Sequence, residues 1–291
     1  MPLDKKTLLV RTGSAVVFGA IMLAGLLGPL WAFALLALLI HFLCLSEAFR
    51  LFDAILKQRP AFATQFIAQV CGLLFLIALM LPILLQRPFF STPDEVATHA
   101  MPRMLPGFFA VALLLYPAVL LLQTALSKTT TPIAAASAFT GHLYITLPLS
   151  LLFLLRVADG AFPIILIAAI WINDTFAYLS GSLIGRTQMT EISPKKTWEG
   201  TLGGALLTVA AAAVFSYFQP QYSYTLTIGL ALCAALPGTL GDLLESRLKR
   251  LAGVKDSGAI MPGHGGALDR FDSLLIATPF AFCYLYLIDL L

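Results

Sequence analysis

The amino-acid sequence predicts an all-α, polytopic integral membrane protein of about nine transmembrane helices with a cytoplasmic N-terminus. Three observations support this fold class: the composition, the series of apolar segments along the chain, and the one-sided placement of basic residues. Of the 291 residues, 59% are hydrophobic and 11% are charged, and the mean hydropathy is +0.90. Soluble domains are about 25% charged. The composition therefore excludes a soluble globule, a disordered chain, collagen and a coiled coil.

Hydropathy indicates nine apolar runs, each close to the roughly 20 residues that a helix needs to cross a bilayer. The expected spans are 12–28, 30–48, 62–86, 104–124, 133–155, 161–184, 198–218, 225–245 and 271–291. The first run follows Lys5, Lys6 and Arg11, as in a signal peptide. Apolar sequence resumes directly after it, however, which favours an uncleaved first span over a cleaved leader. The segment 87–103 is expected to be a surface loop.

Prolines and a capping residue indicate several boundaries of these spans. Pro29, Pro132 and Pro163 stand near the starts of the second, fifth and sixth spans, where a missing N–H costs little. Thr197 is the expected N-cap of the seventh span, with Glu199 in its first turn. Five further prolines fall inside spans and predict kinks: Pro82, Pro117, Pro148, Pro237 and Pro279.

Basic residues are concentrated on one side of the predicted spans. With the N-terminus inside, fifteen are cytoplasmic: Lys5, Lys6, Arg11, Arg50, Lys57, Arg59, Lys128, Arg186, Lys195, Lys196, Arg247, Lys249, Arg250, Lys255 and Arg270. Only Arg87, Arg103 and Arg156 are outside, which satisfies the positive-inside rule and supports an odd number of spans. Eight of the fifteen lie in two cytoplasmic loops, 185–197 and 246–270.

This distribution predicts two regions. Residues 1–160 form an N-terminal transmembrane helical region of about five spans, and residues 161–291 form a transmembrane region with a basic, cytoplasm-facing site. The net charge of +3 is too small to indicate a nucleic-acid partner. Arg50, Lys57 and Arg59, in the loop 49–61, are interpreted as topology determinants near anionic headgroups.

Two polar clusters interrupt the apolar background before the last loop. The first contains Asp174, late in the sixth span, where a carboxylate is expensive unless it is solvated or paired. It is either functional or a structural hydrogen-bonding group. The second runs from Ser193 to Gly200 and places Lys195 and Lys196 before a helix N-terminus. Exposed N–H groups and ammonium charges converge there on anions, although a membrane anchor with a helix cap is the plainer alternative.

The third cluster combines carboxylates with basic residues across the loop 246–270. Asp242, Ser246 and Lys249 are spaced so that they share one helix face. The loop can fold back and bring Asp269, at the start of the ninth span, close to Asp242. Carboxylates gathered in this way repel unless a cation joins them. Oxygen-only ligands among basic groups indicate Mg²⁺ bridging to a phosphate, rather than zinc.

The remaining residues of this cluster complete a site for phosphate chemistry. Asp272 adds a third carboxylate, and the turn 262–266 (PGHGG) frees backbone N–H groups to approach phosphate oxygens. Together these parts indicate phosphoryl or nucleotidyl transfer. Singly they have plainer explanations, with His264 as a turn residue and Lys249 and Arg250 as membrane anchors.

The stretch Ser246–Asp272 resembles the signature of the phosphatidate cytidylyltransferases, also called CDP-diacylglycerol synthases. The matching positions are Ser246, Leu248, Lys249, Arg250, Lys255, Asp256, Gly258, Pro262, His264, Gly265, Gly266, Asp269, Arg270, Phe271 and Asp272. The sequence departs from the pattern at Met261 and Ala267, both apolar positions. The segments SPKKTWEG and D-x-x-A-Y-x-x-G, which begins at Asp174, also resemble the family. The likeness covers the C-terminal third, whereas for the first five spans it rests on hydropathy.

The resemblance implies the reaction CTP + phosphatidate → CDP-diacylglycerol + pyrophosphate, in phospholipid biosynthesis. It implies Mg²⁺ as cofactor, a multi-pass location in the cell (inner or plasma) membrane and an active site facing the cytoplasm. The family's metal site maps onto Asp242 and Asp269, with Asp272 as a further ligand, and Lys249 and Arg250 complete the catalytic set. The expected substrate-binding residues are Ser193, Lys195, Lys196, Ser246, Lys255, His264, Gly265, Gly266, Arg270 and Asp174.

Two alternative functions stay open at this point. A CTP-dependent lipid kinase, or a paralogue that cytidylylates another lipid phosphate, would use the same groups. An ion-coupled transporter would use Asp174 and Asp242, but the charges gather at one face and no internal repeat is visible. The expected partners are CTP, phosphatidate and membrane lipids, and the sequence is compatible with a homodimer.

Overall fold

A computed structural model describes residues 5–57, 62–85, 131–259 and 265–291. Every regular element in these ranges is a helix, and an isolated antiparallel β-bridge joins Gln188 to Thr197. The predicted all-α class is therefore confirmed. The chain divides into two compact units, of which the first holds Met1–Ala158 with Asp256–Leu268 and the second holds Asp159–Lys255 with Asp269–Leu291.

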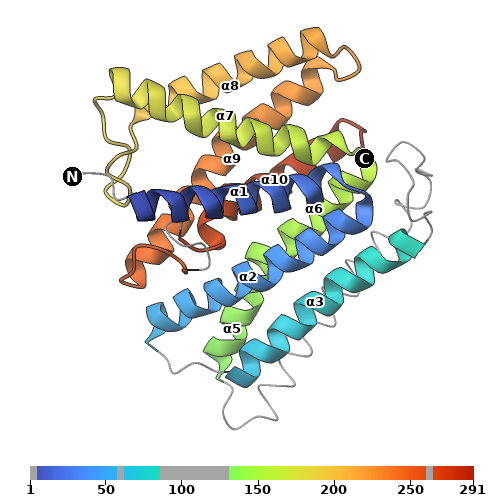
Figure 1. Ribbon diagram of the computed structural model, residues 1–291, viewed down its shortest axis with the longest axis vertical. Coiled ribbons are helices and arrows are strands. Elements are labelled where there is room, and N and C mark those ends of the chain that lie inside the picture. The colour runs from blue at the N-terminus through green and yellow to red at the C-terminus, as the bar shows by residue number, and fades with distance from the viewer. Residues whose placement is uncertain (1–4, 58–61, 86–130, 260–264) are drawn as a thin grey trace. The chain divides into compact units, whose positions relative to one another are not determined.

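In the first unit, one long helix contacts all the others. The elements are α1 (Lys5–Leu27), α2 (Leu30–Leu56), α3 (Phe62–Leu85), α5 (Pro132–Gly141), the π-helical turn η2 (His142–Thr146) and α6 (Leu147–Ala158). Helix α2 packs against each of them, as its position among α1, α3 and α5 in Figure 1 illustrates. Large side chains such as Phe33, Leu45 and Phe153 are fully buried there. An apolar core thus surrounds α2.

Six helices in the described part of the chain are long and apolar enough to cross a membrane. They are Leu30–Leu56, Phe62–Leu85, Pro132–Ala158, Ala161–Ile184, Trp198–Phe218 and Tyr224–Leu251. The expected span 104–124 lies outside the described residues. The first and last expected spans correspond to α1, whose apolar part is the shorter stretch Thr12–Leu27, and to α10, which is not among the six. A multi-pass helical membrane protein is confirmed, and the count of nine stays a prediction.

The expected span 133–155 contains a π-helical turn rather than a simple kink. The N–H of Leu147 donates to the carbonyl of His142, five residues back, and Pro148 follows without an N–H of its own. The turn also contains Thr146, whose buried hydroxyl contacts two histidines. Its Oγ1 lies 2.7 Å from Nδ1 of His142 and 2.9 Å from Nε2 of His41. One hydroxyl therefore serves two imidazole rings inside the apolar bundle.

Arg156 has a different environment from the outer loop position expected for it. Its side chain is buried, and Nη2 donates to the carbonyl of Gly28 at 2.9 Å, just beyond the last residue of α1. Carbonyls at a helix C-terminus lack intrahelical partners, so this guanidinium satisfies one of them. Arg156 is accordingly a helix-capping residue within the first unit.

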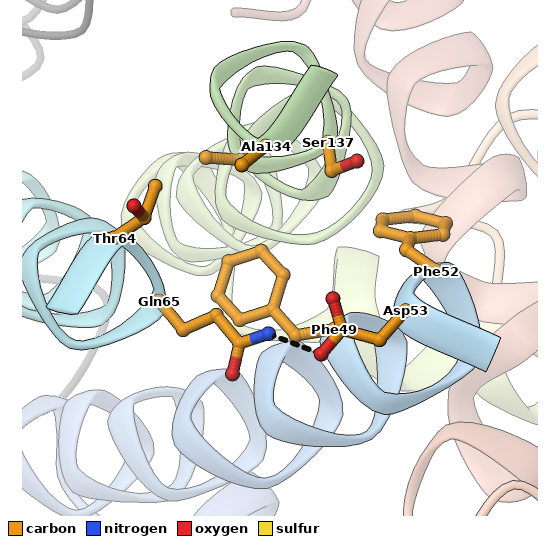
Figure 2. Close-up of a pocket in the computed structure, with 8 residues that line it drawn as sticks. Phe49, Phe52, Asp53, Thr64, Gln65, Ala134 and Ser137 are labelled. Carbon is orange, nitrogen blue, oxygen red and sulfur yellow. Dashed lines mark hydrogen bonds between the residues drawn. The ribbon is translucent and has the colours of Figure 1, made fainter. Parts of the chain in front are cut away.

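A shallow pocket lies between α2, α3 and α5 in the same unit. Its lining includes Phe49, Phe52 and Asp53 of α2 with Gln65 of α3, and Gln65 Nε2 donates to Asp53 Oδ2 at 2.6 Å (Figure 2). The space suits a water-sized group and is too small for a nucleotide.

The second unit contains α7 (Ala161–Ile184), α8 (Trp198–Phe218), α9 (Tyr224–Leu251) and all of α10 (Leu268–Leu287) beyond its first residue. Helices α7 and α8 lie side by side (Figure 1). Small residues permit this approach, because a Cβ on Gly204 would meet Ala177 and one on Gly200 would meet Gly181. The expected N-cap is confirmed, since Thr197 Oγ1 accepts from the N–H of Gly200 at 3.1 Å.

Helices α9 and α10 also approach each other closely. A Cβ on Gly241 would come within 3.0 Å of the Ser273 Cα, so only glycine fits this contact without a shift. Further along, the hydroxyl of Tyr284 donates to the carbonyl of Thr225 at 2.7 Å. Because Gly241 directly precedes Asp242, this contact brings the acidic part of α9 against the first turns of α10.

Candidate active site

The C-terminal half of α9 presents charged residues to α10. Glu245 and Lys249 are one turn apart on α9, and the Lys249 ammonium forms an ion pair with the fully buried Glu245 carboxylate. The same ammonium contacts Asp269 Oδ1 of α10 at 2.6 Å. One lysine thus joins carboxylates from two helices, and its own side chain is only 13% exposed.

Three carboxylates converge beside this lysine. Asp242, Glu245 and Asp272 each offer an oxygen, and these oxygens all lie within 4.8 Å of one another. At this separation three negative charges repel strongly in a partly buried site. A divalent cation with a preference for oxygen would remove the repulsion, and Mg²⁺ has that preference. The donor set therefore fits the predicted cofactor.

Asp242 is further engaged by two neighbours. Lys196, from the loop between α7 and α8, forms an ion pair with Asp242 Oδ2, and the hydroxyl of Ser246 donates to Asp242 Oδ1 at 3.3 Å. The second contact places Asp242 and Ser246 on one face of α9, as predicted for these two residues. The first contact brings one lysine of the second sequence cluster to the third cluster.

The loop that carries Lys196 has its own internal structure. The Glu199 carboxylate accepts from the N–H groups of Arg186 and Thr187 at 3.1–3.2 Å. The N–H of Met189 donates to the carbonyl of Lys196 at 2.9 Å. These bonds connect the two arms of the loop, so the backbone of Lys196 is held at the start of α8.

Acidic groups outnumber basic groups in this network. Asp174 of α7 interacts electrostatically with Lys196 and Asp242, and Asp272 interacts with Asp174 and Lys249. Among the residues that the structure describes here, the interactions join five carboxylates to two ammonium groups: Asp174, Asp242, Glu245, Asp269 and Asp272, with Lys196 and Lys249. The formal excess of negative charge is a second reason to expect cations here.

The other predicted site residues have varied surroundings. Arg250 donates to the carbonyl of Val254 at 3.3 Å, at the end of α9. Ser193 accepts from the N–H of Lys196 through its carbonyl at 3.0 Å. Lys195, Lys255 and Arg270 have exposed side chains. Gly265 has a φ of 86°, which requires glycine, and Gly266 is buried. His264 lies outside the described residues.

Two glutamates of this structure were absent from the site predicted by sequence. Glu245 lies three residues after Asp242, the same spacing as Asp269 and Asp272, and this repeated spacing was the available signal. Glu47 lies inside a 27-residue apolar helix, where a carboxylate is unusual enough to indicate a special role. Neither glutamate lies within Ser246–Asp272, the stretch that resembles the family signature.

The fold and the site together define a helical membrane protein with an acidic, lysine-bridged centre. The sequence model of the cytidylyltransferase family matches residues 9–288, so the chain belongs to that family. Among curated proteins, it is 44% identical to a phosphatidate cytidylyltransferase of Synechocystis sp. over 128 residues, which are 43% of this chain and 43% of that protein.

Two further relatives have the same kind of name. The chain is 47% identical to a phosphatidate cytidylyltransferase of Bacillus subtilis over 122 residues, 40% of this chain and 45% of the relative. It is 44% identical to the chloroplastic phosphatidate cytidylyltransferase 4 of Arabidopsis thaliana over 114 residues, 39% of this chain and 29% of the relative. The matched part thus spans less than half of each of these relatives.

Proposed function

We propose that this protein is a Mg²⁺-dependent phosphatidate cytidylyltransferase, which converts CTP and phosphatidate into CDP-diacylglycerol and pyrophosphate. The observation that carries the proposal is the convergence of Asp242, Glu245 and Asp272 within 4.8 Å beside two paired lysines. Membership of the cytidylyltransferase family and the names of the relatives favour this substrate pair.

Both substrates of the proposed reaction are anions and repel each other. CTP brings about four negative charges, and a lipid phosphate monoester brings about 1.5 to 2. Asp242, Glu245 and Asp272 would hold Mg²⁺, with Asp269 beside them on Lys249. When bound, the cation neutralises triphosphate oxygens and stabilises the charge that develops on pyrophosphate. Lys196 and Lys249 then supply the nearest ammonium groups to the remaining phosphate charge.

The bond changes need no general base from the protein. An oxygen of the lipid phosphate attacks the α-phosphorus of CTP, and the bond from that phosphorus to the bridging oxygen of pyrophosphate breaks. Pyrophosphate leaves with the electron pair. Because the nucleophile is already anionic, no proton has to be removed, so His264 is proposed to contact phosphate or shape the turn.

The length of α9 supports a site at the membrane boundary. Its 28 residues span about 42 Å, whereas the hydrocarbon core is about 30 Å thick. If the apolar N-terminal part spans the core, the turns from Asp242 onward reach the headgroup region. We place this end in the cytoplasm, with the N-terminus on the same side, because of the basic loops 185–197 and 246–270.

A transfer assay tests the proposal against its alternatives. The purified chain in liposomes receives Mg²⁺, phosphatidate and CTP labelled in the α-phosphate. We expect the label to enter the lipid extract with an equal amount of pyrophosphate. A lipid kinase would leave the α-label in soluble CDP, and a transporter would label no lipid. Either result contradicts the proposed function.

Removal of divalent cations is expected to abolish this transfer. Chelation with EDTA should lower lipid labelling to the background level, and added Mg²⁺ should restore it, whereas Zn²⁺ should not, because the donors are all oxygens. In the absence of substrates, Mg²⁺ should raise the Tm of the chain, since an ion that binds the folded state stabilises it. Full activity in EDTA would remove the metal from the mechanism.

Asp269→Asn tests the ligand role that the sequence assigns to Asp269. Its carboxylate contacts Lys249, so the substitution removes one charge and leaves an acceptor for the ammonium. We expect turnover to fall about 10- to 100-fold and the Mg²⁺ concentration for half-maximal activity to rise. The matched control is Asp289→Asn, at an exposed position near the C-terminal end. An unchanged Mg²⁺ requirement would limit Asp269 to holding Lys249.

A further inference from the structure

One carboxylate of the first unit is buried among hydrogen-bond donors from the segment that precedes α10. Glu47 of α2 is fully buried. Its Oε2 accepts from the hydroxyl of Ser257 at 2.7 Å and from the N–H of Leu268 at 2.9 Å. Its Oε1 accepts from the N–H of Ala267 at 3.1 Å. A carboxylate removed from water is costly without such partners, so this residue supplies something that an apolar side chain would not.

Two glycines leave room for this carboxylate. A Cβ on Gly258 would meet the Glu47 carboxylate, and a Cβ on Gly266 would meet both the Ser257 hydroxyl and the Glu47 carboxylate. Because Ser257 and Glu47 are hydrogen-bonded to each other, neither side chain could move aside without disturbing this contact. Both glycines lie between the end of α9 and the start of α10, Gly258 before and Gly266 after residues 260–264, which lie outside the described residues. Gly258 and Gly266 are therefore needed for packing around Glu47.

The same carboxylate lies at the N-terminus of a helix. Leu268 is the first residue of α10, and its N–H has no intrahelical acceptor. A negative charge there satisfies the N–H and complements the helix dipole, as a capping side chain does. Asp269 and Asp272 follow within the first turns of the same helix. Leu268 directly precedes Asp269 in this helix.

We propose that Glu47 is a positioning residue of the transfer reaction, whose carboxylate joins Ser257 to Ala267 and Leu268 and so sets the start of α10. The inference rests on the proposed function and adds to it a residue that contacts none of the reacting groups. The role depends on the carboxylate, because among the described residues its two oxygens accept from Ser257, Ala267 and Leu268, and Oε1 also lies 3.9 Å from Nη2 of Arg50. An amide offers one oxygen, and its NH₂ would face a donor instead of accepting from it.

Glu47→Gln in the full chain in liposomes tests this role. We expect faster hydrogen exchange in the peptide that contains Ala267 and Leu268, and a kcat about 10-fold lower with a higher Mg²⁺ requirement. Glu47→Asp keeps the charge on a shorter side chain. It should restore part of the slow hydrogen exchange and part of the kcat. The matched control is Asp53→Asn, a carboxylate of the same helix bonded to Gln65, which should behave as the unmodified chain.

The outcomes separate this inference from the proposed function. Unchanged exchange at Ala267 and Leu268 in Glu47→Gln overturns it, and so does faster exchange with kcat and Mg²⁺ requirement unchanged. If the unmodified chain transfers no cytidylyl group, the proposed function fails while the exchange measurement still reports on the contact. If Glu47→Gln does not fold, Gly266→Ala replaces it, because its Cβ would meet the Ser257 hydroxyl and the Glu47 carboxylate and so disturb the bond between them. Normal exchange and kcat in that variant also overturn the inference.

Discussion

Asp242→Asn is expected to lower cytidylyl transfer about 100- to 1,000-fold, the largest effect of any single carboxylate in the site. Asp242 takes part in three of the interactions that build the site. It is one of the three convergent carboxylates, it pairs with Lys196, and it accepts from Ser246. An asparagine keeps the size and one acceptor oxygen but loses the charge that attracts a cation.

Stability measurements separate loss of metal from loss of fold in this variant. The network carries more carboxylates than ammonium groups, so removal of one negative charge relieves repulsion when no cation is present. In EDTA the Tm of Asp242→Asn should therefore equal or exceed that of the unmodified chain. Added Mg²⁺ should raise the Tm of the unmodified chain and have much less effect on the variant.

The control for Asp242→Asn is again Asp289→Asn. Asp289 is exposed and has a φ of 55°, a conformation that asparagine also tolerates, so both activity and the Mg²⁺-dependent Tm should be unchanged. Turnover of Asp242→Asn within about threefold of normal would contradict the assigned role, because a lost ligand has a far larger effect.

Helix boundaries followed from the sequence where an apolar run ends at a local stop signal. The spans expected at 161–184 and 198–218 have the observed bounds of α7 and α8, and Thr197 caps α8 as predicted. Helix α2 instead continues to Leu56, beyond the expected end of its span at 48. Hydropathy reports where a helix leaves the hydrocarbon, and it carries no signal for turns that continue into the headgroup region.

The site was predictable to the extent that its spacing is helical. The positions of Asp242 and Ser246 gave their shared face correctly. Contacts between distant segments were not available from spacing. The ion pair of Lys196 with Asp242 depends on how α8 packs beside α9, and the bonds of Glu47 join residues more than 200 positions apart.

Lys249→Met is expected to lower both stability and turnover, because two carboxylates share this one ammonium. Glu245 is fully buried and Asp269 is 10% exposed, so neither can recover its solvation when the lysine is lost. Breaking a buried ion pair from one side destabilises a protein by about 3–5 kcal/mol. We therefore expect a clear loss of folded protein in thermal or urea denaturation, with cytidylyl transfer reduced at limiting CTP.

A second substitution distinguishes the structural role of Lys249 from its role toward CTP. Lys249→Met with Glu245→Gln removes the buried negative charge together with its partner, so the free energy of unfolding should recover by about 2 kcal/mol or more relative to the single variant. Activity should not recover, since the double variant still lacks the ammonium for the triphosphate and now lacks a carboxylate of the cluster as well. Recovery of both would mean that Lys249 serves the fold alone. Recovery of neither would mean that Glu245 is not the group that Lys249 compensates. If Lys249 both pairs with Glu245 and Asp269 and binds the triphosphate of CTP, the double variant should regain stability without regaining turnover.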